Sequence, residues 1–336
     1  MDYIGSKSKL NDWIFSILYK YIDFSNKDLS FMDACAGTGA VSEYAAKLGF
    51  REVISNDLMF YSYCVTYAKL NMTLELLPEA IHHLQIMNSI EPIDGFFLKN
   101  YSEFGDRLYF TMENAQSIDA CRIYIDNIDN LVLKNYLLYC LLEAVSRVSN
   151  TSGTYGAFLK KIKPSALIKL ELKLEPFCTA KKSLVFQEDI LSLLKSKHKF
   201  REDILYIDPP YNERQYGANY HIYETLVRYD NPKIKGVTGL RNWVGESKSK
   251  FCSKVSCLSF LVDIINNSTA SKILLSYSSD GLMSSDDVIS EINSLNKYEV
   301  NLHRKEYKRY KADNKRNNRD DLLYEYLFVL NKDMET

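Results

Sequence analysis

The sequence predicts an α/β fold in which a mostly parallel sheet is interrupted by a mainly helical insertion. Short apolar runs typical of strands alternate with helical patterns in the first 71 residues and again after residue 182. Such alternation is typical of strand–helix–strand units, which build a parallel sheet. Between about residues 72 and 181 it gives way to helical patterns joined by polar stretches. Ligands of such sheets bind where the strands end, so the residues after each strand are the candidate functional residues.

The individual elements follow from these patterns. An amphipathic helix is expected over residues 8–23, with Ser8 as its cap and Leu10, Ile14 and Ile17 on its apolar face. Strands are expected over 29–34, 52–55, 183–186, 204–207, 272–276 and 324–330, and helical patterns within the insertion over 74–87 and 131–148. We therefore assign residues 1–71 and 182–336 to one domain and 72–181 to an inserted domain. Residues 303–319 are expected to be a charged, mobile segment.

Composition excludes several classes of protein. With 46% hydrophobic and 25% charged residues, the 336-residue chain is typical of globular proteins and not of disordered or fibrous ones. The seven cysteines are scattered and never spaced as C-x-x-C, which argues against a disulfide framework or structural zinc and favours a reducing cytoplasm. No run approaches the ~18 apolar residues of a membrane span, and MDYIGSKSKL is not a basic-then-apolar leader, so we expect a soluble protein.

Charge and histidine placement add two expectations. A net charge of −1 does not by itself indicate a nucleic-acid-binding protein, so a polyanion would have to meet local basic surfaces. His82, His83 and His221 stand in helical contexts with no third ligand at a metal-binding spacing. We therefore expect no metal.

The most informative motif is Asp208-Pro209-Pro210-Tyr211, which follows the apolar run 204–207. The prolines fix φ and hold the backbone extended, so that carbonyl groups point outward instead of joining a ladder. Asp208 and a proline carbonyl can then accept both N–H groups of an exocyclic amine, which directs its lone pair toward an electrophilic methyl group, while Tyr211 stacks on the base. The alternative is a diproline turn with an exposed aspartate at a strand end.

A cofactor site is indicated by the run from Asp33 to Gly39, DACAGTG, where a strand turns into a helix. Its glycines, Gly37 and Gly39, permit close backbone approach to a ligand. A second apolar run ends in Asp57, where a carboxylate would meet ribose hydroxyls in a dinucleotide-type fold. The third glycine of the pyrophosphate fingerprint is missing, which favours S-adenosylmethionine over a diphosphate. The alternative is a tight turn followed by an aspartate that caps a helix.

Two further segments are candidates for the same ligand. Asp189 ends another apolar run and could accept from the adenine amine of the cofactor, or it could cap the helix that follows. The stretch Tyr3-Ile4-Gly5-Ser6-Lys7 is a polar entry to the first helix, and alone it would indicate only a flexible start.

The order of these motifs along the chain resembles that of the Dam-type, alpha-group DNA adenine-N6 methyltransferases, and the resemblance covers most of the chain. The motifs are Y-I-G-S-K, D-A-C-A-G-T-G, N-D, E-D and D-P-P-Y. Residues 150–160 and 212–221 resemble the branch that accompanies type II restriction systems. The resemblance implies a Rossmann-like, S-adenosylmethionine-dependent methyltransferase fold, with residues 72–181 as the target-recognition domain. It departs at Cys35, where many members have an aromatic residue, which affects how the methionine moiety packs.

The resemblance also implies roles for individual residues. Cofactor contacts fall on Tyr3, Gly5, Lys7, Asp33, Gly37, Gly39, Asp57 and Asp189, and catalysis falls on Asp208, Pro209, Pro210 and Tyr211. The hypothesis is that the target adenine rotates out of the duplex, stacks on Tyr211, and donates from N6 to Asp208 and the Pro209 carbonyl. The enzyme is expected in the cytoplasm of a bacterial or phage-type system, associated with the nucleoid.

Double-stranded DNA is the expected partner, together with a functionally paired restriction endonuclease that makes no stable contact. Basic patches follow residue 159 and residue 303. The candidate DNA-binding residues are Lys160, Lys161, Arg214, Tyr216, Asn219, Arg241, Lys308 and Arg309. Phosphate contacts would make the affinity fall steeply with salt, whereas solvated loops without a ligand are the alternative.

Other functions stay open at this level. The acid-Pro-Pro-aromatic pocket serves planar amines generally, so the substrate could be an RNA base or a protein glutamine amide, and the chain could also be a non-catalytic DNA-binding relative. An aspartate at position 208, instead of the asparagine common in glutamine methylators, favours a nucleic-acid base. The intact Asp-Pro-Pro-Tyr motif argues against a decayed enzyme.

Overall fold

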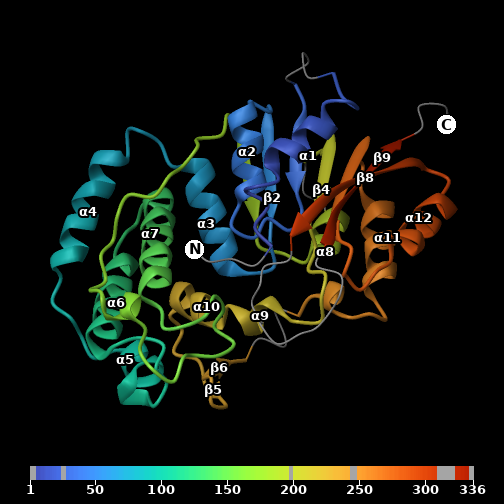
Figure 1. Ribbon diagram of the computed structural model, residues 1–336. Coiled ribbons are helices and arrows are strands. Elements are labelled where there is room, and N and C mark those ends of the chain that lie inside the picture. The colour runs from blue at the N-terminus through green and yellow to red at the C-terminus, as the bar shows by residue number, and fades with distance from the viewer. Residues whose placement is uncertain (1–4, 24–27, 197–199, 243–247, 309–321, 333–336) are drawn as a thin grey trace.

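The computed structural model describes residues 5–23, 28–196, 200–242, 248–308 and 322–332. One large sheet carries helices on both faces, and a helical region lies beside it (Figure 1). The strands are β1 (Ser30–Asp33), β2 (Glu52–Asn56), β3 (Ser183–Phe186), β4 (Ile204–Ile207), β7 (Lys272–Ser278), β8 (Tyr298–Lys308) and β9 (Leu322–Lys332). Each predicted strand is present, within a few residues of its predicted bounds.

The strand order is β3-β2-β1-β4-β7-β9-β8. Neighbours from β3 to β7 pair in parallel, whereas β9 is antiparallel to both β7 and β8, so the predicted mostly parallel sheet is confirmed. From β1 the chain moves to β2 and β3 on one side, and from β4 it moves to β7 on the other. A crevice opens where such an order reverses, outside the carboxyl ends of the two central strands, and ligands bind there.

Alternate side chains of the strands build two cores. Phe31 packs with Tyr206 and Leu274 beneath α1 (Asn11–Leu18) and α2 (Ala40–Leu48). Met32 and Leu205 point to the other face, beneath α8 (Ile190–Lys195), α11 (Cys257–Asn267) and α12 (Ser285–Ser294). Because a strand alternates the faces of its side chains, a continuous apolar run is what a strand buried on both faces requires.

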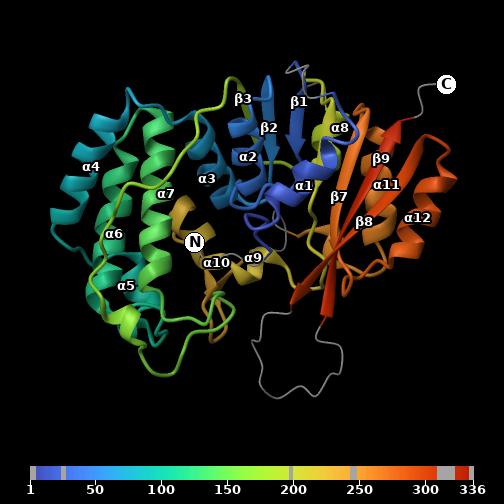
Figure 2. The same cartoon turned by 45° about the horizontal axis from the view of Figure 1, so that its top comes forward.

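The helical region consists of α4 (Leu77–Ser89), α5 (Phe96–Tyr101), α6 (Met112–Asp126) and α7 (Leu131–Val148), with short 3-10 turns at Glu103–Gly105 and Pro164–Leu167. Figure 2 shows α4, α6 and α7 side by side on the opposite side of the sheet from α11 and α12. Its core also takes in side chains of α3 (Phe60–Asn71) and α10 (His221–Arg228). The proposed insertion therefore packs on segments that belong to the other part of the chain.

Smaller elements connect the sheet to this region. The helix α9 (Tyr216–Asn219) precedes α10. After α10 come a hairpin of β5 (Ile234–Lys235) and β6 (Leu240–Arg241) and a 3-10 turn at Lys250–Cys252. In the part of the chain that the structure describes, no helix has the length and apolar character needed to cross a membrane.

Two predictions about local structure were wrong. The first helix begins at Asn11, after Leu10, and no side chain caps it, so Ser8 is not its cap. The segment predicted to be mobile begins inside a strand, because residues 303–308 belong to β8 and pair with β9; the segment beyond residue 308 lies outside the described residues. Val300 and Leu302 place one face of β8 against the core, while charged residues are tolerated on the exposed face of an edge strand.

Asn56 ties three strand ends together. It is 2% exposed, its side-chain amide donates to the carbonyls of Ala34 (3.2 Å) and Glu188 (3.1 Å), and its Oδ1 accepts the N–H of Glu188 (3.1 Å). We expect Asn56→Ala to lower the free energy of unfolding by about 2 kcal/mol in urea denaturation, because buried backbone groups lose their partners. Asn127→Ala, at the exposed end of α6, is the control and should cost less than about 0.5 kcal/mol. Equal losses would contradict this role.

Candidate active site

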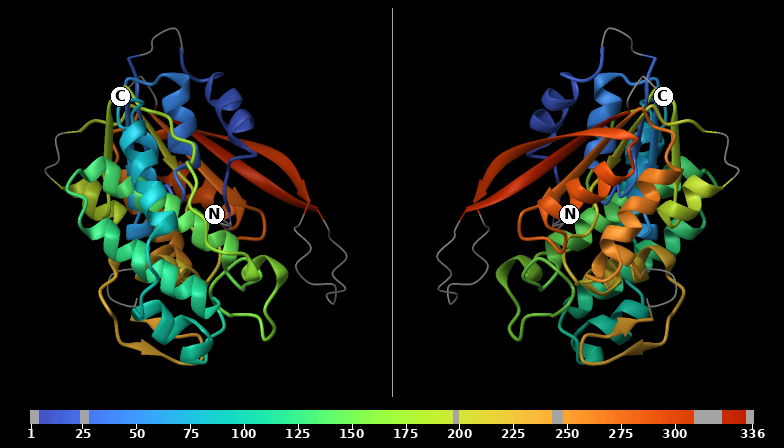
Figure 3. Two further views of the ribbon diagram at one scale, coloured as in Figure 1. Left: turned by 90° about the vertical axis from the view of Figure 1, so that its left-hand side faces the viewer. Right: turned by 90° about the vertical axis from the view of Figure 1, so that its right-hand side faces the viewer.

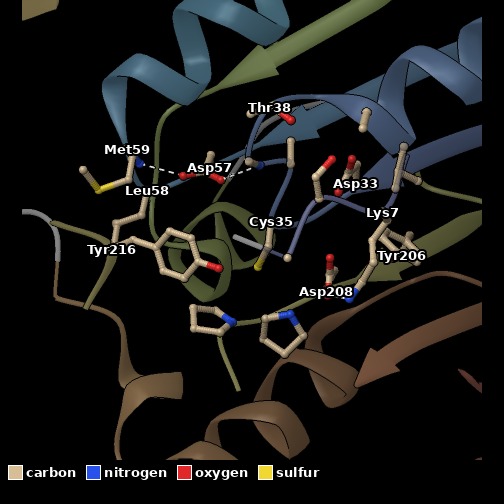
Figure 4. A pocket seen from close by; sticks show the side chains of 18 of the residues that line it. Lys7, Asp33, Cys35, Thr38, Asp57, Leu58, Met59, Tyr206, Asp208 and Tyr216 are labelled. Carbon is tan, nitrogen blue, oxygen red and sulfur yellow. Dashed lines mark hydrogen bonds and ion pairs between the residues drawn. The ribbon is translucent and has the colours of Figure 1, made fainter. Parts of the chain in front are cut away.

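A crevice lies at the carboxyl ends of β1 and β4, where the strand order reverses (Figure 4). Segments that are far apart in the sequence meet there. The lining includes Gly5, Ser6, Lys7, Asp33, Cys35, Gly37, Thr38, Asp57, Leu58, Met59, Tyr206, Asp208, Pro209, Pro210, Tyr211 and Tyr216. The structure therefore brings the Asp-Pro-Pro-Tyr motif together with Gly5, Lys7, Asp33, Gly37 and Asp57, as the sequence predicted.

The Asp-Pro-Pro-Tyr motif begins where β4 can no longer pair. The ladder with β7 ends at Ile207, opposite Leu275. After Asp208 come Pro209 and Pro210, which have no N–H groups to continue the pairing. Within the described chain nothing donates to the carbonyl of Pro209, which remains an available acceptor. The end of the motif is held in place, since the Tyr211 carbonyl accepts the N–H of Leu282 (3.0 Å) and its ring meets Tyr277 edge-on at 6.0 Å.

Lys7 links the Asp-Pro-Pro-Tyr motif to strand β9. Its ammonium lies 3.2 Å from Asp208 Oδ1 and 2.8 Å from Glu325 Oε1, and 5.2 Å from the centre of the Tyr211 ring, although the residue is only 4% exposed. Burial alone would lower the pKa of Lys7, but the two carboxylates outweigh it and raise the pKa, so Lys7 stays charged. Burial raises the pKa of Asp208 to about 7, against the lowering effect of Lys7.

Gly5 allows Tyr211 to approach the N-terminal segment. Its φ of 84° lies in the left-handed region, and a Cβ on it would lie 3.0 Å from the Tyr211 hydroxyl oxygen. A larger residue would be strained there and would press on the ring. Gly5 and Lys7 thus shape the same wall of the crevice as Tyr211.

Asp33, the last residue of β1, is 1% exposed. Its Oδ2 accepts a hydrogen bond from the Ser42 hydroxyl (2.7 Å), while Oδ1 is buried without a partner among the described residues. Burial raises the pKa of this carboxyl to about 7, and the Ser42 hydrogen bond opposes the increase. A buried oxygen without a partner beside a cavity is an acceptor for a ligand donor.

Asp57 connects the turns that follow β1 and β2. Its Oδ2 accepts the N–H of Gly37 (2.8 Å) and its Oδ1 accepts the N–H of Met59 (2.8 Å), contacts drawn in Figure 4. Burial raises its pKa to about 6, although these backbone hydrogen bonds oppose the shift. The carboxylate lines the crevice and also fixes the shape of its wall.

For two predicted cofactor residues, the structure shows contacts within the fold. Gly39 is not among the residues that line the crevice, and a Cβ on it would lie 2.8 Å from Thr66 Oγ1, so glycine is required there to let α2 approach α3. Asp189 caps α8 by accepting the N–H of Ser192 (3.0 Å), which is the alternative that its position allowed. Tyr3 lies outside the described residues.

The candidate DNA-binding residues are spread over several segments. Lys160 and Lys161 are exposed on the loop that follows α7, and this loop is anchored by the buried Asn150, which donates to the carbonyls of Leu108 and Leu159. In Figure 3 the loop and the long β8–β9 hairpin project from the same side of the molecule.

The remaining candidates lie near α9 and β8. Arg214 is exposed, Tyr216 lines the crevice and stacks on Tyr220 at 5.7 Å, and Asn219 is half-buried with its backbone carbonyl bound to the N–H of Tyr155. Lys308 is the last residue of β8, and its side chain and Arg309 lie outside the described residues.

Arg241 is buried in an ion pair, which argues against the predicted contact with DNA. It is 8% exposed, and its guanidinium makes two hydrogen bonds to the carboxylate of Asp230 (3.0 and 2.8 Å). The sequence shows a basic residue beside a glycine turn, but it does not show that the acidic partner returns to it from the end of α10.

Comparison with known proteins identifies the family. A model of the D12 class of N6 adenine-specific DNA methyltransferases matches residues 3–288. The chain is 37% identical to the type II methyltransferase M.NlaIII of Neisseria lactamica over 99% of both chains. This chain belongs to the D12 class of N6 adenine-specific DNA methyltransferases.

Further relatives of this methyltransferase carry similar names. It is 36% identical to the type II methyltransferase M.CviAII of Paramecium bursaria Chlorella virus 1, over 98% of this chain and 97% of the relative. It is 39% identical to M.FokI of Planomicrobium okeanokoites, over 99% of this chain but 53% of that longer protein. The predicted family, its restriction–modification branch, the fold class and the enzyme class are confirmed.

One residue beside the site, Glu325, was not predicted from the sequence. Glu325 holds Lys7 from β9, in the strand sequence Leu322-Leu323-Tyr324-Glu325-Tyr326-Leu327-Phe328. A single acid inside an apolar strand was the available signal, because a buried carboxylate requires a partner.

The opposite placements of Arg241 and Arg214 can be tested together. We expect Arg241→Ala to lower the free energy of unfolding by about 1–2 kcal/mol, because the ion pair is lost while the half-exposed Asp230 regains water. DNA affinity should stay within about twofold once the protein is folded, because the side chain does not face solvent. Arg214→Ala should leave unfolding unchanged and reduce the salt slope of DNA binding by about 1. A selective loss of DNA affinity in the Arg241 variant would contradict the assignment.

Proposed function

We propose that this DNA adenine methyltransferase uses S-adenosylmethionine as the methyl donor and acts on an adenine rotated out of the duplex into the crevice beside Asp208. One observation carries the proposal. The carboxylate of Asp208, the carbonyl of Pro209 and Oδ1 of Asp33 lie around one crevice at the point where the strand order reverses, and no donor among the described residues binds the Pro209 carbonyl or Asp33 Oδ1. Asp208 and Pro209 supply acceptors for an amine, and Asp33 supplies an acceptor for a cationic ligand.

The residues of the crevice fit S-adenosylmethionine. The ligand carries an ammonium and a sulfonium, and the crevice is lined by the carboxylates of Asp33, Asp57 and Asp208 against the single cation of Lys7 among the described lining residues. Asp33 Oδ1 is a buried acceptor that receives no hydrogen bond within the described part of the chain, and the left-handed turn at Gly37 (φ 54°) allows the backbone to approach a ligand closely. When bound, S-adenosylmethionine supplies an electrophilic methyl group.

The chain's own residues orient the amine. Lys7 occupies Oδ1 of Asp208, so the other carboxylate oxygen and the Pro209 carbonyl accept the two N6–H groups of the adenine. Both hydrogen bonds draw the nitrogen lone pair out of conjugation and toward the donor, and Tyr211 stacks on the base. The amine becomes acidic only as the N–C bond forms, so positioning and electrostatics carry the rate more than base strength does.

The net charge of the chain is −1, so the charge of the whole molecule does not attract DNA. Local basic surfaces therefore hold the DNA. Lys160, Lys161 and Arg214 are exposed and can contact phosphates, whose counterions are then released. We extend the proposal to a paired restriction endonuclease that reads the same sequence without stable contact. Its support is the type II designation of the relatives.

Asp208→Ala tests the assignment of the amine acceptor. We expect single-turnover methyl transfer to unmethylated bacterial DNA, followed as N6-methyladenine by mass spectrometry, to fall at least about 10³-fold, because the amine loses its charged acceptor. Binding of S-adenosylmethionine, measured by calorimetry, should stay within about threefold, since Asp33 and Asp57 remain. The control is Asp263→Ala, an exposed acid on α11, which should retain full activity. Retention of a tenth or more of the activity by the Asp208 variant would remove the assignment.

The pH dependence follows from the buried carboxyl. Burial raises the pKa of Asp208 to about 7, and only its ionised form accepts the amine without a competing proton. The single-turnover rate at saturating S-adenosylmethionine should therefore rise with pH through about 7 and level off above it. Burial raises the pKa of Asp33 to about 7 as well, and the negative charge of Asp33 adds to the raised pKa of Asp208. A rate that is constant from pH 6 to pH 8 would contradict the role of the carboxylate.

A further inference from the structure

Glu325 is a buried acid close to the site that does not line the crevice. It lies on β9, is 7% exposed, and its Oε1 accepts hydrogen bonds from the Lys7 ammonium (2.8 Å) and from the Ser276 hydroxyl of β7 (2.7 Å). A buried carboxylate is costly unless it is paired. Here one ammonium serves two carboxylates, Glu325 and Asp208, so the three groups together carry a charge of −1 when all are ionised.

We propose that Glu325 is a positioning residue that holds the Lys7 ammonium and shares its charge, so that Asp208 remains an available acceptor for the target amine. The inference rests on the proposed function, in which Asp208 accepts the N6–H group.

The distances support the sharing of the Lys7 charge between Glu325 and Asp208. Lys7 is 2.8 Å from Glu325 but 3.2 Å from Asp208, and it also lies over the Tyr211 ring. Without Glu325, the ammonium would be free to pair with Asp208 alone. A carboxylate in a buried one-to-one ion pair is a weaker acceptor for a second donor, because the lysine charge already compensates it.

The same arrangement leaves an excess of negative charge beside the crevice. That excess would complement a cationic methyl donor bound in the crevice. Glu325 thus acts on the chemistry through Lys7 and not by touching a ligand.

Several titratable groups act on Asp208. They come from the N-terminal segment, β1 and its turn, β4, α9 and β9, and are Lys7, Asp33, Cys35, Tyr206, Tyr216 and Glu325. Burial is the main cause of the raised pKa of Asp208, and the negative charge of Glu325 adds to it, whereas Lys7 lowers it. Removing only the charge of Glu325 should therefore lower the pKa of Asp208.

Glu325→Gln removes the charge and keeps the shape. At saturating S-adenosylmethionine and pH 8, we expect the single-turnover rate to fall about tenfold, and the acidic limb of the pH profile to move to lower pH by about half a unit or more. Dissociation constants for S-adenosylmethionine and DNA should change less than about threefold. Glu325→Asp, which keeps the charge, should leave the acidic limb in place, and Ser276→Ala, which keeps both carboxylates, is the matched control.

An acidic limb that stays in place or moves to higher pH in Glu325→Gln would overturn the inference. So would a Glu325→Gln protein that does not fold while Glu325→Asp folds and is active, since the charge would then serve stability. The two proposals fail separately. An active Asp208→Ala variant removes the proposed acceptor, whereas an inactive Asp208→Ala variant combined with an unshifted Glu325→Gln profile removes only the role of Glu325.

Discussion

The buried ammonium of Lys7 is the contact on which the site depends. It joins the N-terminal segment, the motif after β4 and the antiparallel strand β9, which lie far apart in the sequence. A lysine with so little exposure stays charged only because two carboxylates face it. The ion pair fixes one oxygen of Asp208, and Gly5 then allows Tyr211 to close on the same segment. The geometry of the amine pocket is therefore set by residues that need not touch the base.

The fold places this contact where a cationic ligand can use it. Asp33 is the last residue of β1 and Asp208 directly follows β4, the two central strands at the point where the strand order reverses. The tyrosines of α9 and α10 extend from the same motif into the core of the helical region. Glu224 of α10 in turn accepts the N–H groups of Phe60 and Tyr61 at the start of α3. The segment after Asp-Pro-Pro-Tyr is thus packed against the turn that carries Asp57.

Much of this was predictable because it depends on local pattern. Apolar runs such as 204–207 determine strands buried on both faces, and the residues that end them meet at one edge of the sheet. Three features depend on long-range contacts that spacing does not reveal. Asp230 buries Arg241, Thr66 makes a glycine necessary at position 39, and Lys7 makes an acid tolerable at position 325. Position 189 shows a further limit, since one sequence pattern suits both a helix cap and a ligand contact.

The proposed amine pocket consists of Asp208, held on one oxygen by Lys7, and the Pro209 carbonyl, which together accept the amine of an extruded adenine. A crystal structure of the protein with duplex DNA and a non-reactive analogue of S-adenosylmethionine would show these contacts. We expect N6 to lie about 2.7–3.2 Å from both a carboxylate oxygen of Asp208 and the Pro209 carbonyl, with Lys7 still bound to the other carboxylate oxygen. An adenine bound in the crevice with N6 more than about 4 Å from Asp208 would contradict it.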